Sequence, residues 1–259
     1  MRSEKVEDVT VTGEREAGSQ IKEVAADLLG RKVVDLSPRL EAGIPRWPTH
    51  PHTVIDPTVV HEHDGYYCQS ISMAEHTGSH VDTPSHVHAD RMHQTLDHMS
   101  LTQLIGRAVV YHLGSLRLQA GESATRDQIL EYEQAHGVAL KQGDIALLDF
   151  DWMRYWTTTS DAHWYAANQP GLDEDAVRLF QEREVKAVGA DTIACETVLK
   201  DGKEISAYGH KRYWLPNGIY IMEELANLSQ IPTECLYVAL PLRIANGSGS
   251  PIRAVAFLP

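Results

Sequence analysis

Residues 76–86, HTGSHVDTPSH, combine metal-binding side chains with residues that oppose a helix. Gly78 and Pro84 interrupt helices, and the three β-branched residues in the stretch are poor helix formers. In an extended chain, side chains two residues apart point to the same face. The groups that bind metals or transfer protons therefore share one face: His76, His80, Asp82 and His86.

A straight strand cannot bring these four groups to one point. At roughly 3.3 Å per residue, His76 and Asp82 would lie about 20 Å apart, whereas the ligands of one ion lie within about 2 Å of it. We therefore expect the chain to bend at Gly78. We also expect Pro84 to break the strand and to let His86 swing back toward the site.

The residue types predict the chemistry of this site. Imidazole and carboxylate ligands suit a divalent Zn²⁺ or Mn²⁺ ion, and we predict that His76, His80 and Asp82 hold one and leave positions open for water. Such an ion lowers the pKa of bound water and polarises a carbonyl oxygen. His86 is then the candidate general base and general acid. The alternative is a set of surface or capping histidines, which would leave the shared face and the helix breakers a coincidence.

Composition excludes several classes of function. The formal net charge is −13, and phosphate binding needs concentrated Lys and Arg, so we expect neither nucleic acid nor a membrane surface as a partner. The first residues lack the apolar core of a signal peptide, and no apolar run approaches the roughly 18 residues of a membrane span. The number of cysteines is odd, and the three lie far apart in the sequence: Cys68, Cys195 and Cys235. This pattern is typical of free thiols in a reducing compartment. We expect a cytoplasmic protein.

The 259 residues suit one large domain after a polar beginning. We expect residues 1–20 to form a mobile arm, or an arm packed on a partner subunit, and residues 21–30 a short helix that ends at Gly30. The predicted division is an arm and helix over 1–30 and one domain over 31–259.

Strands outnumber helices in the predicted domain. Strands are expected at 33–37, 54–63, 66–76, 107–113, 144–150, 185–192, 235–243 and 252–258, and at the start of 218–228. Helices are expected at 101–106, 124–137 and 172–184. This pattern favours an α/β domain with a mixed sheet or barrel over a strictly alternating parallel fold.

The motif resembles the HxGTHxDxPxH signature of the cyclase-like metal-dependent hydrolases, the family that includes bacterial kynurenine formamidase and isatin hydrolase. The similarity runs over roughly residues 33–259. It includes VVDLSPRLEAGIPRWP, PGLDEDAVRLFQEREVKAVGADT, GIYIMEELANL and GSPIRAVAFLP. The resemblance implies a single domain with mixed sheets and the swivelling β/β/α (cyclase-like) fold. It also implies a homodimer or homotetramer in which a neighbouring subunit lends residues near the active site.

The resemblance extends the predicted site. It implies that His210 and Glu223 complete the metal site, around one ion or around a second ion bridged by Asp82. It places Trp47 in a loop matched to the family's Pro-Trp loop, next to the substrate. Many members have Thr-Gly-Trp after the strand at 144–148, and this chain departs from them there with Phe150 and Trp152. We expect both aromatic side chains to contact the substrate.

Together these features predict a metal-dependent hydrolase that acts on the C–N bond of a small amide, an arylformamide or a cyclic amide. Two alternatives stay open at this stage. The same site could cleave an ester or a lactone, or the protein could bind a ligand through its metal without catalysis.

Overall fold

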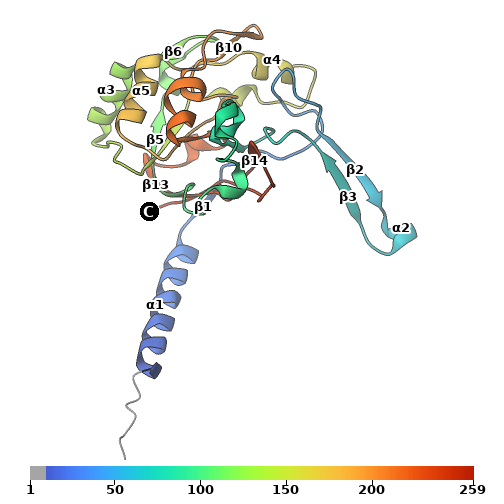
Figure 1. Cartoon of the computed structure of the whole chain (residues 1–259), viewed down its shortest axis with the longest axis vertical. Coiled ribbons are helices and arrows are strands. Elements are labelled where there is room, and N and C mark those ends of the chain that lie inside the picture. The colour runs from blue at the N-terminus through green and yellow to red at the C-terminus, as the bar shows by residue number, and fades with distance from the viewer. Residues whose placement is uncertain (1–9) are drawn as a thin grey trace, which may run out of the picture.

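A nine-stranded sheet organises the computed structural model, which describes residues 10–259 (Figure 1). In spatial order its strands are β1 (Val33–Asp35), β15 (Val255–Phe257), β13 (Glu234–Val238), β5 (Ile105–His112), β7 (Ile145–Asp149), β9 (Ala187–Ala190), β12 (Tyr220–Glu223), β4 (His80–Asp82) and β14 (Gly249–Pro251). The adjacent strands β5, β7, β9 and β12 are parallel, and the other neighbouring pairs are antiparallel. The prediction of an α/β fold with a mixed sheet is confirmed.

The remaining elements are helices and two-stranded ribbons. The helices are α1 (Thr10–Gly30), α2 (His61–Asp64), α3 (Arg126–His136), α4 (Ala162–Ala167) and α5 (Glu174–Glu182). The two-stranded ribbons pair β2 (Val54–Val59) with β3 (Cys68–Ser72), β6 (Ser123–Ala124) with β8 (Gly171–Leu172), and β10 (Leu199–Lys200) with β11 (Lys203–Glu204). Helices α3 and α5 lie side by side on one face of the sheet (Figure 1).

Side chains of the parallel strands alternate between the two faces of the sheet, and an apolar core covers each face. Tyr111 and Leu148 point to the face that α3 and α5 cover, where they pack with Phe180. Val110 and Leu147 point to the opposite face and pack in a second apolar layer. The sheet therefore lies between two apolar cores.

Some predicted elements differ from the structure. Helix α1 begins at Thr10 rather than at residue 21, so residues 10–20 of the predicted arm are helical. Residues 1–9 of the predicted arm lie outside the described residues. The predicted helix at 101–106 is wrong: residues 101–104 form turns and β5 begins at Ile105. A helix of six residues is unstable unless other contacts stabilise it.

The predicted pair of hairpin strands is confirmed, but the segment that connects the two strands differs from the prediction. Strands β2 and β3 pair antiparallel as expected. However, β2 ends at Val59, and residues His61–Asp64 form the single helical turn α2, which ends at Gly65 with φ +75°. Strand β14 was not predicted, because its short GSP sequence carries no strand signal.

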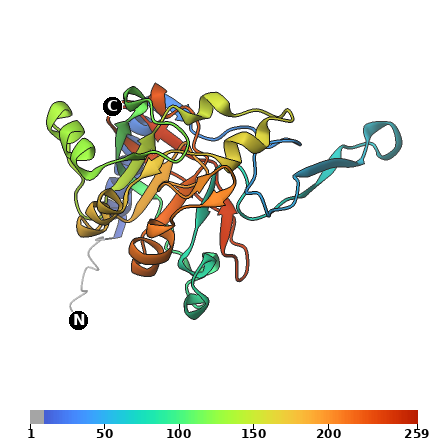
Figure 2. The ribbon, with the colours of Figure 1, turned by 90° about the horizontal axis from the view of Figure 1, so that it is seen from above.

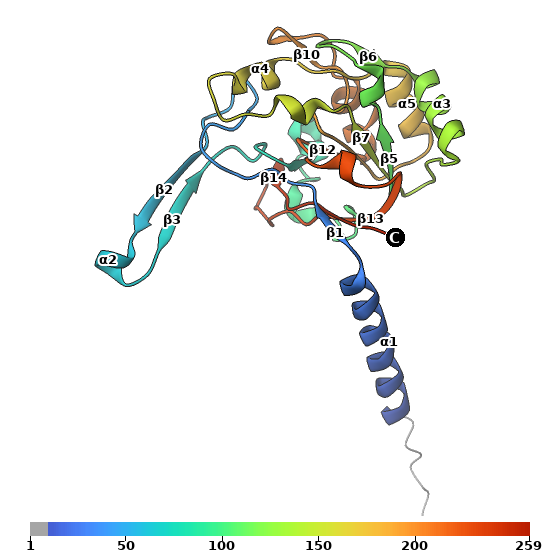
Figure 3. The ribbon, with the colours of Figure 1, turned by 180° about the vertical axis from the view of Figure 1, so that it is seen from behind.

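Two elements project from the rest of the chain. Helix α1 and the β2–β3 hairpin leave the sheet in different directions (Figures 1 and 3), and the view from above shows the hairpin reaching far outward (Figure 2). Exposed apolar side chains lie along both elements: Ile21, Val24 and Leu29 on α1, and Tyr66, Tyr67 and Ile71 on the hairpin. Within residues 10–259, no helix combines the length and apolar character needed to cross a membrane.

Candidate metal centre

Strand β4 carries the motif between β12 and β14. Its antiparallel register sets His80 opposite Glu223 of β12, and it sets Asp82 opposite Gly249 of β14. His80 and Asp82 share a face and are almost completely buried. Pairing on both sides therefore fixes two candidate ligands on β4 and brings a third from β12.

The backbone around β4 bends where the sequence predicted. Gly78 has φ +65°, a left-handed conformation that favours glycine, and it turns His76 back over the strand. After the strand, Pro84 begins the 3₁₀ turn η1 (Pro84–His86). This turn returns His86, whose Nε2 lies 4.0 Å from Oδ2 of Asp82.

A glycine on β14 makes room for the returning histidine. A Cβ atom on Gly249 would lie 2.4 Å from Cε1 of His76 and 2.6 Å from the Val81 carbonyl oxygen. Neither neighbour can move freely, because one is a candidate ligand and the other is sheet backbone. Position 249 therefore accepts only glycine if His76 is to face Asp82.

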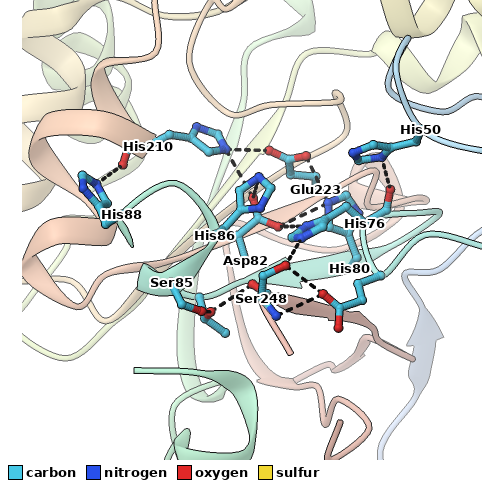
Figure 4. Close-up of polar contacts among 12 residues, drawn as sticks. His50, His76, His80, Asp82, Ser85, His86, His88, His210, Glu223 and Ser248 are labelled. Atoms are coloured by element: carbon cyan, nitrogen blue, oxygen red, sulfur yellow. Dashed lines mark hydrogen bonds and ion pairs between the residues drawn. The ribbon is translucent and has the colours of Figure 1, made fainter. Parts of the chain in front are cut away.

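Two groups of candidate ligands meet at Asp82 (Figure 4). In the first, Oδ1 of Asp82 lies 2.5 Å from Nδ1 of His76 and 3.4 Å from Nε2 of His80. In the second, Oδ2 of Asp82 lies 3.3 Å from Nε2 of His210. The second group also includes Glu223, with one carboxylate oxygen 3.2 Å from Nε2 of His210. Its other oxygen lies 3.2 Å from Nε2 of His80 in the first group. The structure thus brings all five predicted ligands together.

Hydrogen bonds fix which nitrogen of each histidine is free. His80 donates its Nδ1–H to the Gly78 carbonyl at 2.7 Å, and His210 donates its Nδ1–H to Glu196 at 2.7 Å. Each ring therefore presents an unprotonated Nε2 in its neutral form. His88 donates to the His210 carbonyl at 3.0 Å and steadies the same turn.

In His76 the other ring nitrogen, Nε2, is the hydrogen-bond donor. The Ser248 hydroxyl lies 2.7 Å from Oε2 of Glu75, and because a carboxylate only accepts, Ser248 donates there. Its oxygen then accepts Nε2–H of His76 at 2.9 Å. In the neutral ring Nδ1 of His76 is then the unprotonated nitrogen, and it faces Asp82, as a metal ligand requires.

These donor atoms fit a divalent cation. The buried Nε2 of His80 and Oε1 of Glu223 have no hydrogen-bond partner among the described residues, and such atoms destabilise a fold unless something satisfies them. Nitrogen and carboxylate oxygen donors in mixed sets suit Zn²⁺ or Mn²⁺. The two overlapping groups have room for one ion or for a bridged pair.

Protons occupy the ligand set when no cation does. Burial alone would lower the pKa of His80, but the neighbouring carboxylates of Glu223 and Asp82 raise it to about 10. Burial opposes ionisation of Asp82, yet the charges of His76 and His86 and the hydrogen bond from His210 hold its pKa well below the usual range. A metal ion and these protons therefore compete for the same atoms.

His86 stands outside both ligand groups and lines the cavity beside them. Burial lowers its pKa to about 4, and the charges of His76 and His210 act in the same direction against the charge of Asp82. Its ring lies over that of His76, with the centroids 3.9 Å apart. A neutral imidazole in this position can accept a proton from a group in the cavity.

A cavity of about 230 Å³ lies over the candidate ligands. Its apolar wall consists of Trp47, Val87, Ile193, Ala194 and Val198. An ion pair joins two further lining residues, with Lys211 Nζ 2.5 Å from Oε1 of Glu204. Trp47 thus lines the cavity beside the candidate ligands, and its contact with a substrate stays a prediction.

Phe150 and Trp152 lie elsewhere. Both side chains are buried in the core under α5 and do not line the cavity. Asp191 accepts the backbone N–H groups of both residues, which pulls the segment after β7 inward, and the Trp152 indole donates to the Asn168 carbonyl at 3.3 Å. Their positions do not support the prediction that they contact the substrate.

Four residues near the site escaped the sequence analysis: Glu75, Ser248, Glu196 and His50. Glu75 and Ser248 are 173 positions apart, and Glu196 reaches His210 across 14 residues. None belongs to a recognisable spacing, so only the folded chain reveals them. His50, which lines the cavity, follows Trp47 by three residues, and that proximity was the one available signal.

This chain is similar to several known proteins. The Cyclase family model matches residues 34–197, which include the whole 76–86 motif. An isatin hydrolase of Roseibium aggregatum is 27% identical over 201 residues, 72% of this chain and 73% of that protein. A kynurenine formamidase of Geobacillus thermodenitrificans is 27% identical over 223 residues, 85% of this chain and 95% of that protein. The solved isatin hydrolase A from Labrenzia aggregata, bound to benzyl benzoate, has a TM-score of 0.78 at 26% identity, covering 93% of this chain and 99% of that one.

Proposed function

This chain belongs to the Cyclase family, and from that premise we propose that it is a metal-dependent hydrolase of a small amide, an arylformamide or a cyclic amide. The observation that supports this best is the position of Asp82, which both candidate ligand groups share at the base of a cavity. The similarity to an isatin hydrolase and a kynurenine formamidase agrees with C–N bond cleavage.

The ligands in this proposal are His76, His80 and Asp82, joined by His210 and Glu223. A divalent ion held there would lower the pKa of a water molecule and polarise the amide carbonyl. The donor set suits Mn²⁺ or Zn²⁺. Because two groups overlap at Asp82, the site has ligands for one or two ions per chain.

The protein's own groups perform the proton transfers. His86 accepts a proton from the attacking water and then delivers it to the leaving nitrogen. Its neutral state suits the first step, and the proton gained there is the one that it delivers in the second. Its place outside the ligand groups leaves the ring available for both steps. Trp47 and the apolar wall hold the flat part of a small substrate and exclude other water molecules.

A purely ligand-binding protein would not need an uncommitted histidine at this position. The decisive comparison is between the metal-loaded wild type and His86→Ala, assayed on formamides, cyclic amides and lactones, with metal content measured in both samples. We expect amide hydrolysis that chelators abolish and that falls at least 100-fold in the variant at unchanged metal content. Undiminished hydrolysis in metal-containing His86→Ala would contradict the mechanism, and a preference for lactones would reassign the substrate class.

We also propose that the chain forms a homodimer or homotetramer. The support is the β2–β3 hairpin, which projects from the sheet (Figure 3). It exposes Tyr66, Tyr67 and Ile71, and exposed apolar surface of this kind commonly marks an interface. Light scattering during size-exclusion chromatography should give a multiple of the 28.9 kDa chain mass. A monomer at micromolar concentration would contradict this part of the proposal.

The cytoplasmic location also stays part of the proposal. All three cysteines are free thiols, as expected in a reducing compartment.

A further inference from the structure

The proposed reaction leaves one polar side chain in the cavity without a role. His50 lines the cavity beside the candidate ligands, and its ring centroid lies 6.0 Å from that of His76 (Figure 4). Resting on the proposed function, we propose that His50 accepts a hydrogen bond from the amide N–H of the substrate. His50 would thereby select amides that carry this hydrogen over N-substituted amides and esters.

The backbone holds His50 in place before any substrate enters. Its N–H donates to the Trp47 carbonyl at 2.9 Å and closes a tight turn. The Arg46 guanidinium donates to the His50 carbonyl at 2.5 Å and to the Trp47 carbonyl at 3.4 Å. A fixed acceptor loses little entropy when it binds, so the turn is suited to recognition.

The hydrogen bond that His50 makes determines which nitrogen is available. Its Nδ1 lies 3.3 Å from the backbone carbonyl of His76, and because a carbonyl only accepts, Nδ1 carries the hydrogen. In the neutral ring, Nε2 then has a lone pair and no hydrogen. Within residues 10–259, Nε2 of His50 makes no hydrogen bond, which leaves it available to a ligand.

The rest of the cavity offers little competition for an amide hydrogen. The remaining lining is apolar, belongs to the candidate metal ligands and His86, or is joined in the ion pair of Glu204 and Lys211. An amide nitrogen is bonded directly to the carbonyl carbon that reacts over the ligands. A substrate without N–H would leave the Nε2 lone pair unsatisfied, and sites that bind a hydrogen discriminate strongly against analogues that lack it.

The test compares kcat/KM for a cyclic aryl amide and for its N-methyl counterpart, at pH 8 with metal-loaded protein. Histidine has an ordinary pKa of about 6.5, so the ring is neutral at this pH. His50→Asn keeps a donor for the His76 carbonyl and removes the acceptor at the Nε2 position. His52→Asn is the matched control, because His52 lies in the same loop outside the cavity lining.

We expect the wild type to favour the N–H amide by roughly tenfold, the value of one hydrogen bond. In His50→Asn this ratio should approach one, with unchanged metal content and an unchanged rate on the N-methyl amide. His50→Gln, whose side-chain oxygen can take the place of Nε2, should recover part of the ratio. His52→Asn should behave as the wild type.

A ratio that persists in His50→Asn would mean that the bulk of the methyl group causes the preference, and it would overturn the inference. A wild-type ratio near one would also overturn it. Failure of the metal-loaded wild type to hydrolyse either amide would instead remove the proposed function, so the two failures are distinguishable.

Discussion

Oε1 of Glu196 lies 2.7 Å from Nδ1 of His210 and also accepts the His210 backbone N–H at 3.0 Å. The Glu196 side chain is fully buried, and this pairing keeps its pKa low against the effect of burial. A carboxylate behind a histidine fixes the ring and raises its basicity as a ligand. Glu196 is therefore placed to strengthen the candidate group of Asp82, His210 and Glu223.

Glu196→Gln should weaken metal binding at that group. The substitution keeps the shape of the side chain and removes its charge, so we expect affinity to fall by about 10- to 100-fold. Titration of the metal-free protein with Mn²⁺ or Zn²⁺ measures this directly. Glu182→Gln, at an exposed helical position, serves as the control, and equal affinities in the two variants would contradict the role.

Ser248→Ala should weaken the group of His76, His80 and Asp82. Without the hydroxyl, Nε2–H of His76 loses its acceptor, and the ring can rotate away from Asp82. We expect roughly tenfold weaker metal binding and little change in thermal stability when both proteins are metal-free. Unchanged affinity would show that Glu75 and Ser248 do not position His76.

Gly249→Ala should displace His76. The added methyl group would meet the imidazole and the β4 backbone at impossible distances, so the strand or the ring must shift at a cost of about 1–3 kcal/mol. We expect a lower Tm together with loss of bound metal. Gly30→Ala is the control, because nothing surrounds that position, and a Gly249→Ala protein with full metal content would contradict the proposed close approach.

The gap in Tm between metal-free and metal-loaded protein should widen from pH 7 to pH 10. His80 has a pKa of about 10 in the metal-free fold, above the ordinary value of about 6.5. A raised pKa contributes stability that is complete below 6.5 and is lost as the pH rises through 10. The loaded protein lacks this loss because the ion replaces the proton. Scanning calorimetry at several pH values measures both curves, and a constant gap would contradict the competition.

The sequence predicted the local part of this site and little of the distant part. The bend at Gly78 and the return of His86 follow from residue types within eleven positions. His210 and Glu223 gave no such signal, and only the family resemblance pointed to them. The approach of Glu223 depends on the pairing of β4 with β12, which joins segments about 140 residues apart. His210 comes from the helical turn Gly209–Tyr213 before β12.

The aromatic residues show where the family resemblance misplaced part of the cavity wall. Trp47 lies in a proline-rich turn that faces the ligands, whereas Phe150 and Trp152 follow a buried strand. The carboxylate of Asp191, some 40 positions later, binds their backbone and draws them into the core. No sequence pattern near residue 150 indicates that contact, so the side of the sheet on which these rings lie could not be predicted.

Elemental analysis of the purified wild type beside Asp82→Ala tests the central claim most directly. Asp82 is the one residue common to both ligand groups, so its removal should empty them together. We expect one or two Mn or Zn atoms per wild-type chain and almost none in a variant whose circular dichroism shows that it remains folded. No transition metal in the wild type after reconstitution, or the same metal content in Asp82→Ala, would contradict it.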